Sequence, residues 1–235
     1  MSEQENDIYL YLKPTAIIDS DHPTIQAYAR ETMGESADPV ERAAKLYLAV
    51  RDGIRYDPYA PFYLPEHYQA SKVLERRRSF CIPKAALLCA LGRAAGIPAR
   101  IGFADVRNHL ATRQLLDYLG SNLFVYHGYA DLFLEGKWVK ATPAFNRELC
   151  ERHHVPPLEF NGREDCLFHP YNHEHKKFLE YVTYHGTYAD VPVDEILIAW
   201  KQAYGEERIE GWIRMFEERG VETGRDFSRE EVYRG

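Results

Sequence analysis

The sequence lacks the features that place a chain in or across a membrane. No stretch of its residues approaches the roughly 18 consecutive apolar residues of a membrane-spanning helix. The first residues, MSEQENDIYLYL, have neither the basic nor the apolar region of a secretory signal. We therefore expect a cytoplasmic protein with no membrane partner.

Cysteine and basic charge are also scarce. The 4 cysteines include no CxxC pair and no dense disulfide framework, so we expect reduced thiols. The 36 acidic residues outnumber 29 Lys and Arg, and the resulting net charge of -7 argues against a nucleic-acid partner. With 45% hydrophobic residues, no repeat and no linker, residues 1–235 read as one domain.

Helix start and stop signals are clear in the first half of the chain. Pro23 opens a predicted helix to about residue 33, and Asp38 caps a second one, with Pro39 at its first position, to about residue 54. A shorter helix is expected at 70–77, and the run IPKAALLCALGRAA at 82–95 predicts a long one that Gly96 ends.

Strand patterns follow the long helix. Residues 99–104 predict a strand, 110–119 a helix, and 123–134 with 137–141 a hairpin around the turn at 135–136. Weak alternation at 7–12 favours a short edge strand. The order of elements predicts an α+β fold.

The last third reads as loops followed by helices. We predict loops over 142–171, a helix near 176–184, and amphipathic helices at 193–203 and 206–219. The domain would thus have a core at about 38–146 and a C-terminal helical extension at about 172–219.

Cys81 stands at the mouth of the 82–95 helix. The positive end of the helix dipole and the free N–H groups of the first turn favour a thiolate over a thiol, so we expect a lowered pKa and a nucleophile. The same N–H groups, including that of Cys81, could hold an oxyanion. A buried, inert thiol is the competing interpretation, and for Cys89 in the same helix it is the favoured one.

A thiolate cannot protonate a leaving amine, so the chemistry needs an acid–base partner. His127, on the first strand of the predicted hairpin, is the best placed histidine. A structural histidine bonded to backbone is the alternative.

These residues stand in a recognisable order. FCIPKA at 80–85, AAGIPAR at 94–100, YHGYAD at 126–131 and GKWV at 136–139 together resemble the transglutaminase-like superfamily, over about residues 40–145. The resemblance implies a papain-like core with a central helix on a small antiparallel sheet. It also implies a Cys-His-Asp triad.

The third triad position departs from the family pattern. It matches Thr142, where a carboxylate is expected. Three alternatives stay open: Thr142 orients His127 through its hydroxyl, Asn146 does so as an amide, or Asp131 or Asp105 reaches in from another strand.

The resemblance implies a cysteine amidase, peptidase or acyltransferase. Cys81 would attack an amide or peptide carbonyl, and water or an amine would resolve the thioester; we favour hydrolysis. No cofactor is needed, and the expected partner is a peptide or an amide-containing small molecule. Candidate substrate contacts are Tyr63, Tyr68, Asn108 and His109.

Two other function classes compete. Loss of the triad Asp would fit a catalytically inactive binding module of the same fold. The second competing class is a histidine-based metalloenzyme. It is suggested by a histidine-rich stretch, His169, His173 and His175, with His153 and His154 upstream, although no familiar zinc spacing is present.

Overall fold

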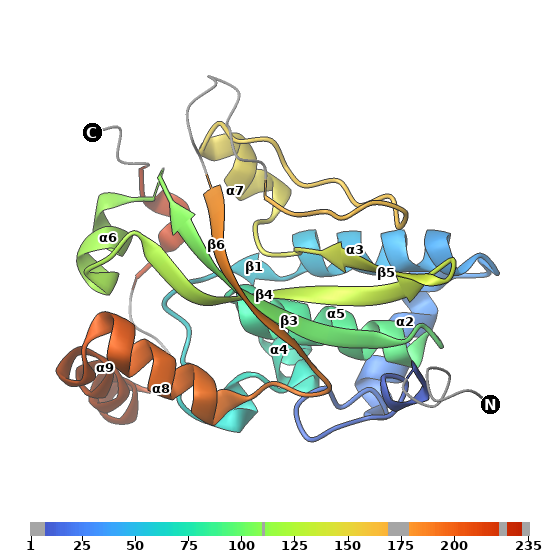
Figure 1. Ribbon diagram of the computed structural model, residues 1–235, viewed down its shortest axis with the longest axis horizontal. Helices are drawn as coiled ribbons and strands as arrows, with labels where there is room; N and C mark the ends of the chain where they lie inside the picture. Colours follow the sequence, from blue (N-terminus) through green and yellow to red (C-terminus); the bar gives the residue numbers. More distant parts are fainter. Residues whose placement is uncertain (1–7, 110, 169–178, 221–224, 232–235) are drawn as a thin grey trace.

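A computed structural model describes residues 8–109, 111–168, 179–220 and 225–231. Its main sheet has four antiparallel strands in the order β5-β4-β3-β6 (Figure 1). The strands are β3 (Ala99–Asn108), β4 (Leu123–Leu134), β5 (Lys137–Ala141) and β6 (Leu179–Tyr188). Together with the helices, this sheet confirms the predicted α+β class.

The central element is helix α5 (Cys81–Ala94), which is buried along almost its whole length. It packs against β3 and β4, and the three N-terminal helices pack around it: α2 (Pro23–Met33), α3 (Pro39–Gly53) and α4 (Ala70–Arg76). Asp38 caps α3 by accepting a hydrogen bond from Val40 N, as the sequence predicts. A central helix on an antiparallel sheet is thus confirmed.

A short parallel pair fixes the approach to Cys81. Strand β1 (Arg55–Tyr56) pairs with β2 (Arg78–Ser79), which ends two residues before Cys81. Asp57 N donates to Ser79 O at 2.9 Å, so the pairing continues to the residue before Phe80. The 3-10 turn η1 (Pro65–His67) lies in the irregular segment between the two strands.

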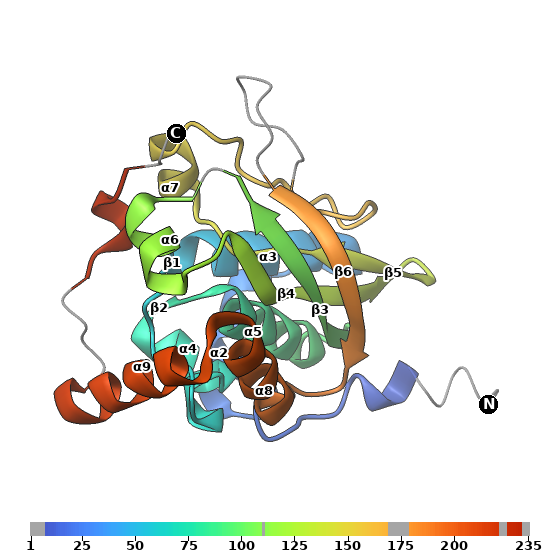
Figure 2. The ribbon, with the colours of Figure 1, turned by 60° about the vertical axis from the view of Figure 1, so that its left-hand side comes forward.

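The remaining elements surround the far ends of β3 and β4. Helix α6 (Arg113–Leu119) follows β3, and α7 (Arg147–Arg152) follows β5. Helices α8 (Val193–Tyr204) and α9 (Glu206–Arg219) then lie together on the side of α4 and α5, and η2 (Phe227–Arg229) lies by α6 (Figure 2). Within the described part of the chain, no helix combines the length and the apolarity needed to cross a bilayer.

Two predicted elements were wrong. Residues 8–10 form a helical turn where a strand was expected. The predicted helix at 176–184 is strand from Leu179 onward, so the C-terminal extension contains β6 as well as the two helices. The segment is rich in Tyr, Val and Thr, which fit a pleated surface, and pairing with β3 decides its conformation.

Candidate active site

Cys81 is the first residue of α5, and its sulfur faces backbone donors. Among the described residues, no side chain caps this helix start, so the N–H groups of Cys81 and Ile82 stay available. Both N–H groups, and that of Gly128 on β4, act on the sulfur and lower the pKa of its thiol. The predicted cradle of N–H groups is therefore present.

Gly128 allows the strand to come this close to the helix. A Cβ at this position would lie 2.8 Å from Ile82 Cα, a distance that backbone atoms cannot accommodate without moving apart. The missing side chain thus lets β4 pass directly over the first turn of α5. His127, the preceding residue of β4, is brought to the same place.

Burial outweighs the donors at the sulfur. Desolvation raises the pKa of the Cys81 thiol to about 11, although the N–H groups and the charge of Lys84 act in the opposite direction. The sequence-based prediction of a lowered pKa was therefore wrong in direction. The N–H groups at the helix start stabilise the thiolate as expected, but the loss of hydration in this apolar surrounding destabilises it more strongly.

His127 is buried among aromatic rings, with 7% of its surface exposed. Its ring lies 5.0 Å from that of Phe168 and 6.5 Å from that of Tyr181, centroid to centroid. Burial lowers the pKa of the imidazole to about 3, and no hydrogen bond of Nε2 to a described residue offsets this. At neutral pH the free site therefore holds a neutral thiol and a neutral imidazole.

The Thr142 side chain is buried close to this region but makes no hydrogen bond within the described structure. Its hydroxyl lies near that of Tyr181 and lowers the pKa of that phenol, while burial raises it more strongly. Its backbone is held by bonds from Tyr47 Oη to Thr142 O and from Thr142 N to Cys166 O. Its predicted role as the third triad member stays a prediction.

The other three candidates for the orienting residue are engaged elsewhere. Asn146 Oδ1 accepts a hydrogen bond from Tyr56 N at 3.2 Å. Asp131 pairs with Arg100 at 2.8 Å, and Asp105 accepts from His185 Nε2 at 2.7 Å and from Tyr126 N at 3.0 Å.

Of the four predicted substrate contacts, Asn108 lies in the pocket that contains Cys81 and His127. Tyr68 is fully buried with its ring 5.7 Å from that of Phe80, outside the lining. Tyr63 packs on His67, and His109 pairs with Glu180 at 3.3 Å.

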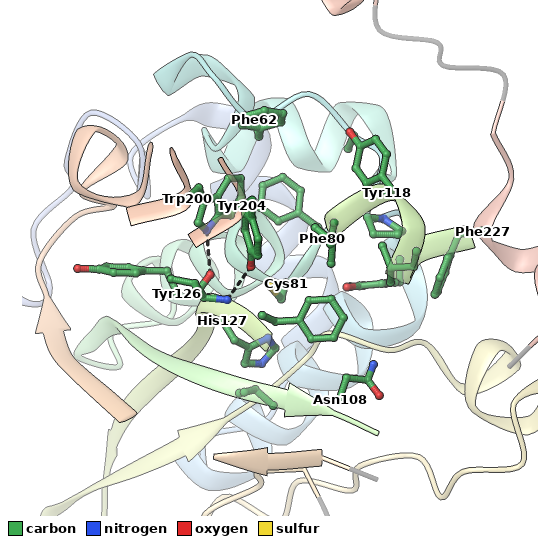
Figure 3. A pocket seen from close by; sticks show the side chains of 18 of the residues that line it. Phe62, Phe80, Cys81, Asn108, Tyr118, Tyr126, His127, Trp200, Tyr204 and Phe227 are labelled. Atoms are coloured by element: carbon green, nitrogen blue, oxygen red, sulfur yellow. Dashed lines mark hydrogen bonds between the residues drawn. The ribbon is translucent and has the colours of Figure 1, made fainter. Parts of the chain in front are cut away.

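The pocket over Cys81 is lined mainly by aromatic side chains. Figure 3 shows His127 and Asn108 on one side of Cys81 and Phe62, Trp200 and Tyr118 on the other. More than half of the lining residues are Phe, Tyr or Trp, and the described lining includes no Asp, Glu, Lys or Arg.

Three of these aromatic residues come from the C-terminal helices. Trp200 and Tyr204 lie on α8, and Trp212 lies on α9. The sequence analysis missed them, because an aromatic residue on an amphipathic helix reads as ordinary packing. Trp200 and Tyr204 are four residues apart and share one face of α8, but the sequence does not tell which surface that face covers.

Helix α8 also holds the backbone just before His127. Trp200 Nε1 donates to Val125 O at 2.8 Å, and Val125 N donates to Tyr204 Oη at 2.7 Å. The next residue, Tyr126, has a φ of 57°, a left-handed conformation that a tyrosine rarely adopts. The two helix side chains thus satisfy a strand segment that turns out of the regular ladder.

The described structure contains two of the five histidines proposed for a metal, His153 and His154. His169, His173 and His175 lie outside the described residues. His153 Nε2 faces Glu230 O at 3.3 Å, and within the described ranges no group of three or more His, Cys, Asp or Glu side chains could hold a metal.

Comparison with known proteins gave one family match and several structural ones. The profile of the family described as transglutaminase-like superfamily matches residues 26–143. A structure named "Putative Cysteine Protease" from Cytophaga hutchinsonii is 20% identical, with a TM-score of 0.46, over 58% of this chain and 42% of that one. The periplasmic domain of TgpA from Pseudomonas aeruginosa is 21% identical, with a TM-score of 0.42, over 59% of this chain and 47% of that one.

This chain covers less than half the length of both structures. A search of curated proteins gave no match.

Proposed function

Because the chain belongs to the transglutaminase-like superfamily, we propose that it is a cysteine enzyme that cleaves an amide or peptide bond through a thioester on Cys81. The observation that carries the proposal is the position of Cys81 at the open start of α5 beside His127, both in the wall of one pocket. Family membership gives the fold, and this geometry supports the assignment of roles.

In the first half-reaction, the Cys81 sulfur forms a bond to the substrate carbonyl carbon while its proton passes to the His127 imidazole. The tetrahedral oxyanion is held by the N–H groups of Cys81 and Ile82. The carbon–nitrogen bond then breaks, and the amine leaves with the proton from the imidazolium. In the second half, His127 takes a proton from water, the hydroxide attacks the thioester, and the carbon–sulfur bond breaks to return the thiol and release the acid.

The neutral state of both groups sets the order of events. With the thiol pKa near 11 and the imidazole pKa near 3, a resting thiolate–imidazolium pair is unfavourable. Proton transfer therefore accompanies attack, when a bound substrate consumes the developing charge on sulfur. Hydrolysis is the favoured outcome, and transfer of the acyl group to an amine would share the first half.

The kinetic test uses release of 4-nitroaniline from N-acyl 4-nitroanilides. Cys81→Ala should abolish turnover, and His127→Ala should lower kcat by about 100-fold or more. Cys89→Ala removes a buried thiol from the same helix and is the matched control, because Cys89 lies outside the pocket and its sulfur donates to Arg100 O. Full turnover in Cys81→Ala would reject the proposal.

A second function, a binding module without catalysis, has one observation in its favour. No hydrogen bond from a described residue orients the His127 ring, and the described pocket lining contains no Asp or Glu that would complete a triad. This alternative predicts that ligands bind the pocket while no acyl group is ever found on Cys81.

A further inference from the structure

The pocket beside Cys81 is built partly by segments of the chain outside the family match. The match ends at residue 143, whereas Trp200, Tyr204, Trp212 and Phe227 all follow it. Cys81 and His127 therefore lie within the part that matches the family, whereas part of the pocket wall lies beyond it. The wall decides which acyl group binds, whereas Cys81 and His127 would carry out the reaction.

The wall is preassembled by ring contacts. Tyr118 and Trp212 stack at 4.0 Å with their planes 13° apart, and the Phe62 ring lies 5.3 Å from that of Trp200. Such pairs hold large, flat side chains in place at little further entropic cost when a ligand binds. The pocket is thus shaped before a substrate arrives.

Apart from Tyr and Trp, the polar side chains of the described lining are those of Cys81, His127 and Asn108. His127 and Asn108 are on one side of Cys81, and the rings of Phe62 and Tyr118 are on the other (Figure 3). A substrate carbonyl would lie by the polar groups, and the rest of its acyl group would extend among the rings. The described lining offers no charged side chain to pair with an ionic group there.

Two charged residues near this wall, Glu230 and Arg225, are already partnered. Glu230 Oε2 accepts from Thr112 Oγ1, and Glu230 Oε1 accepts from Tyr59 Oη at 2.8 Å. The Arg225 guanidinium lies 4.9 Å from the Tyr118 ring centroid and 5.0 Å from that of Tyr59. Neither Glu230 nor Arg225 contributes to the pocket lining.

We infer that the substrate presents an uncharged, bulky apolar acyl group, aromatic or branched, which fills the aromatic wall while its carbonyl lies at Cys81. Burial of an apolar group in such a wall is favourable, because apolar surface is removed from water. Burial of an unpaired carboxylate or ammonium there is unfavourable, because the ion loses its hydration and gains no partner. This inference rests on the proposed thioester chemistry but concerns a different part of the site.

The first test is binding without catalysis. In Cys81→Ser with Trp138→Phe, all tryptophan emission comes from the two pocket residues, because the chain has 3 Trp. Titration with 3-phenylpropanamide should change this emission saturably, and succinamic acid, an anionic amide, should bind at least about tenfold more weakly. Equal binding of the two, or no binding of the aromatic amide, would overturn the inference.

The second test is turnover of matched esters. The 4-nitrophenyl ester of 3-phenylpropanoic acid should have a kcat/KM at least about tenfold above that of 4-nitrophenyl hemisuccinate. Leu119 is a half-buried lining residue at the end of α6, and a positive charge can be introduced into the lining at this position. Leu119→Lys should shift the preference towards the anionic ester, whereas the neutral control Leu119→Met should keep the aromatic preference.

The two tests separate the failure of each proposal. Saturable binding of the aromatic amide without release of 4-nitrophenolate would reject the thioester chemistry and leave the acyl specificity standing. Release of 4-nitrophenolate from both esters at equal kcat/KM would support the chemistry and reject the specificity.

Discussion

The Cys81 sulfur is subject to two opposing effects. Three N–H groups lower the pKa of its thiol, and removal from water raises it to about 11. The sequence reveals the first effect, because a helix start can be recognised from its residues. The second depends on which rings from distant segments close over the sulfur, and no local pattern carries that information.

The first prediction concerns the ionisation of this thiol. Alkylation of Cys81 by iodoacetamide should accelerate with rising pH well into the alkaline range, because the thiol pKa is about 11. Peptide mass analysis after timed labelling assigns the rate to Cys81. A rate that is already constant below neutral pH would contradict the raised pKa.

The second prediction addresses the third triad position. Thr142→Val keeps the shape of the side chain and removes a hydroxyl that has no partner within the described structure. We expect kcat to stay within a few-fold of the wild-type value, measured with the same 4-nitroanilide. A loss of about 100-fold would assign the orienting role to that hydroxyl.

At the scale of elements, the contact between α5 and β4 brings the pair together. The helix start and the hairpin could both be predicted from the sequence, because proline, glycine and apolar periodicity mark them locally. Their contact rests on Gly128, whose role shows only when Ile82 is seen beneath it. Strand β6 was missed for a related reason, since its partner β3 lies about 80 residues earlier.

The third prediction tests this contact. Gly128→Ala should separate β4 from α5, lower the free energy of unfolding by about 1–3 kcal/mol and reduce kcat strongly. Gly211→Ala, in the interior of α9, is the matched control, because a Cβ there would lie 4.0 Å from Arg214 Nη2 and meet no close contact. That control should raise stability by about 1 kcal/mol. Equal behaviour of the two variants in urea denaturation would contradict the close approach.

The fourth prediction tests the hold of α8 on β4. The Tyr204 hydroxyl accepts from Val125 N and donates to Leu123 O at 3.1 Å. Tyr204→Phe should cost about 1–3 kcal/mol of stability, because both backbone groups lose a partner. Its kcat should fall as well, since the backbone before His127 is released.

Tyr188→Phe is the control for this variant, because its hydroxyl bonds the exposed Glu195 at 3.1 Å. It should stay within about 0.5 kcal/mol of wild type. Equal losses of unfolding free energy in the two phenylalanine variants would show that the hydrogen bonds from Tyr204 to β4 do not stabilise the protein more than an exposed bond does.

At the scale of the whole molecule, burial of neutral histidines links stability to pH. The folded pKa of His127 is about 3 and that of His67 about 4, both below the ordinary value of 6.5. His67 Nδ1 accepts a hydrogen bond from Leu64 N, which requires the neutral ring. Between the folded pKa of each histidine and its ordinary value of 6.5, the unfolded chain therefore binds more protons than the folded one.

The fifth prediction follows from that difference. The stability contributed by these two residues is present above about pH 6.5 and is lost as pH falls towards 4 and then 3. His67→Asn does not titrate in this range and keeps an acceptor for Leu64 N, so its urea midpoint should fall less between pH 6.5 and 4. If the urea midpoint of the variant and that of the wild type fell equally between pH 6.5 and 4, a buried neutral His67 would be contradicted.

The central claim is that Cys81 carries the acyl group and that His127 enables its transfer. The most direct measurement is the mass of the protein after brief reaction with 4-nitrophenyl 3-phenylpropanoate and an acid quench, with peptide mapping of the added group. We predict one 3-phenylpropanoyl group on Cys81 in the wild-type protein and almost none in His127→Ala at the same time. Acylation of another residue, or equal acylation of Cys81 in both proteins, would contradict the account.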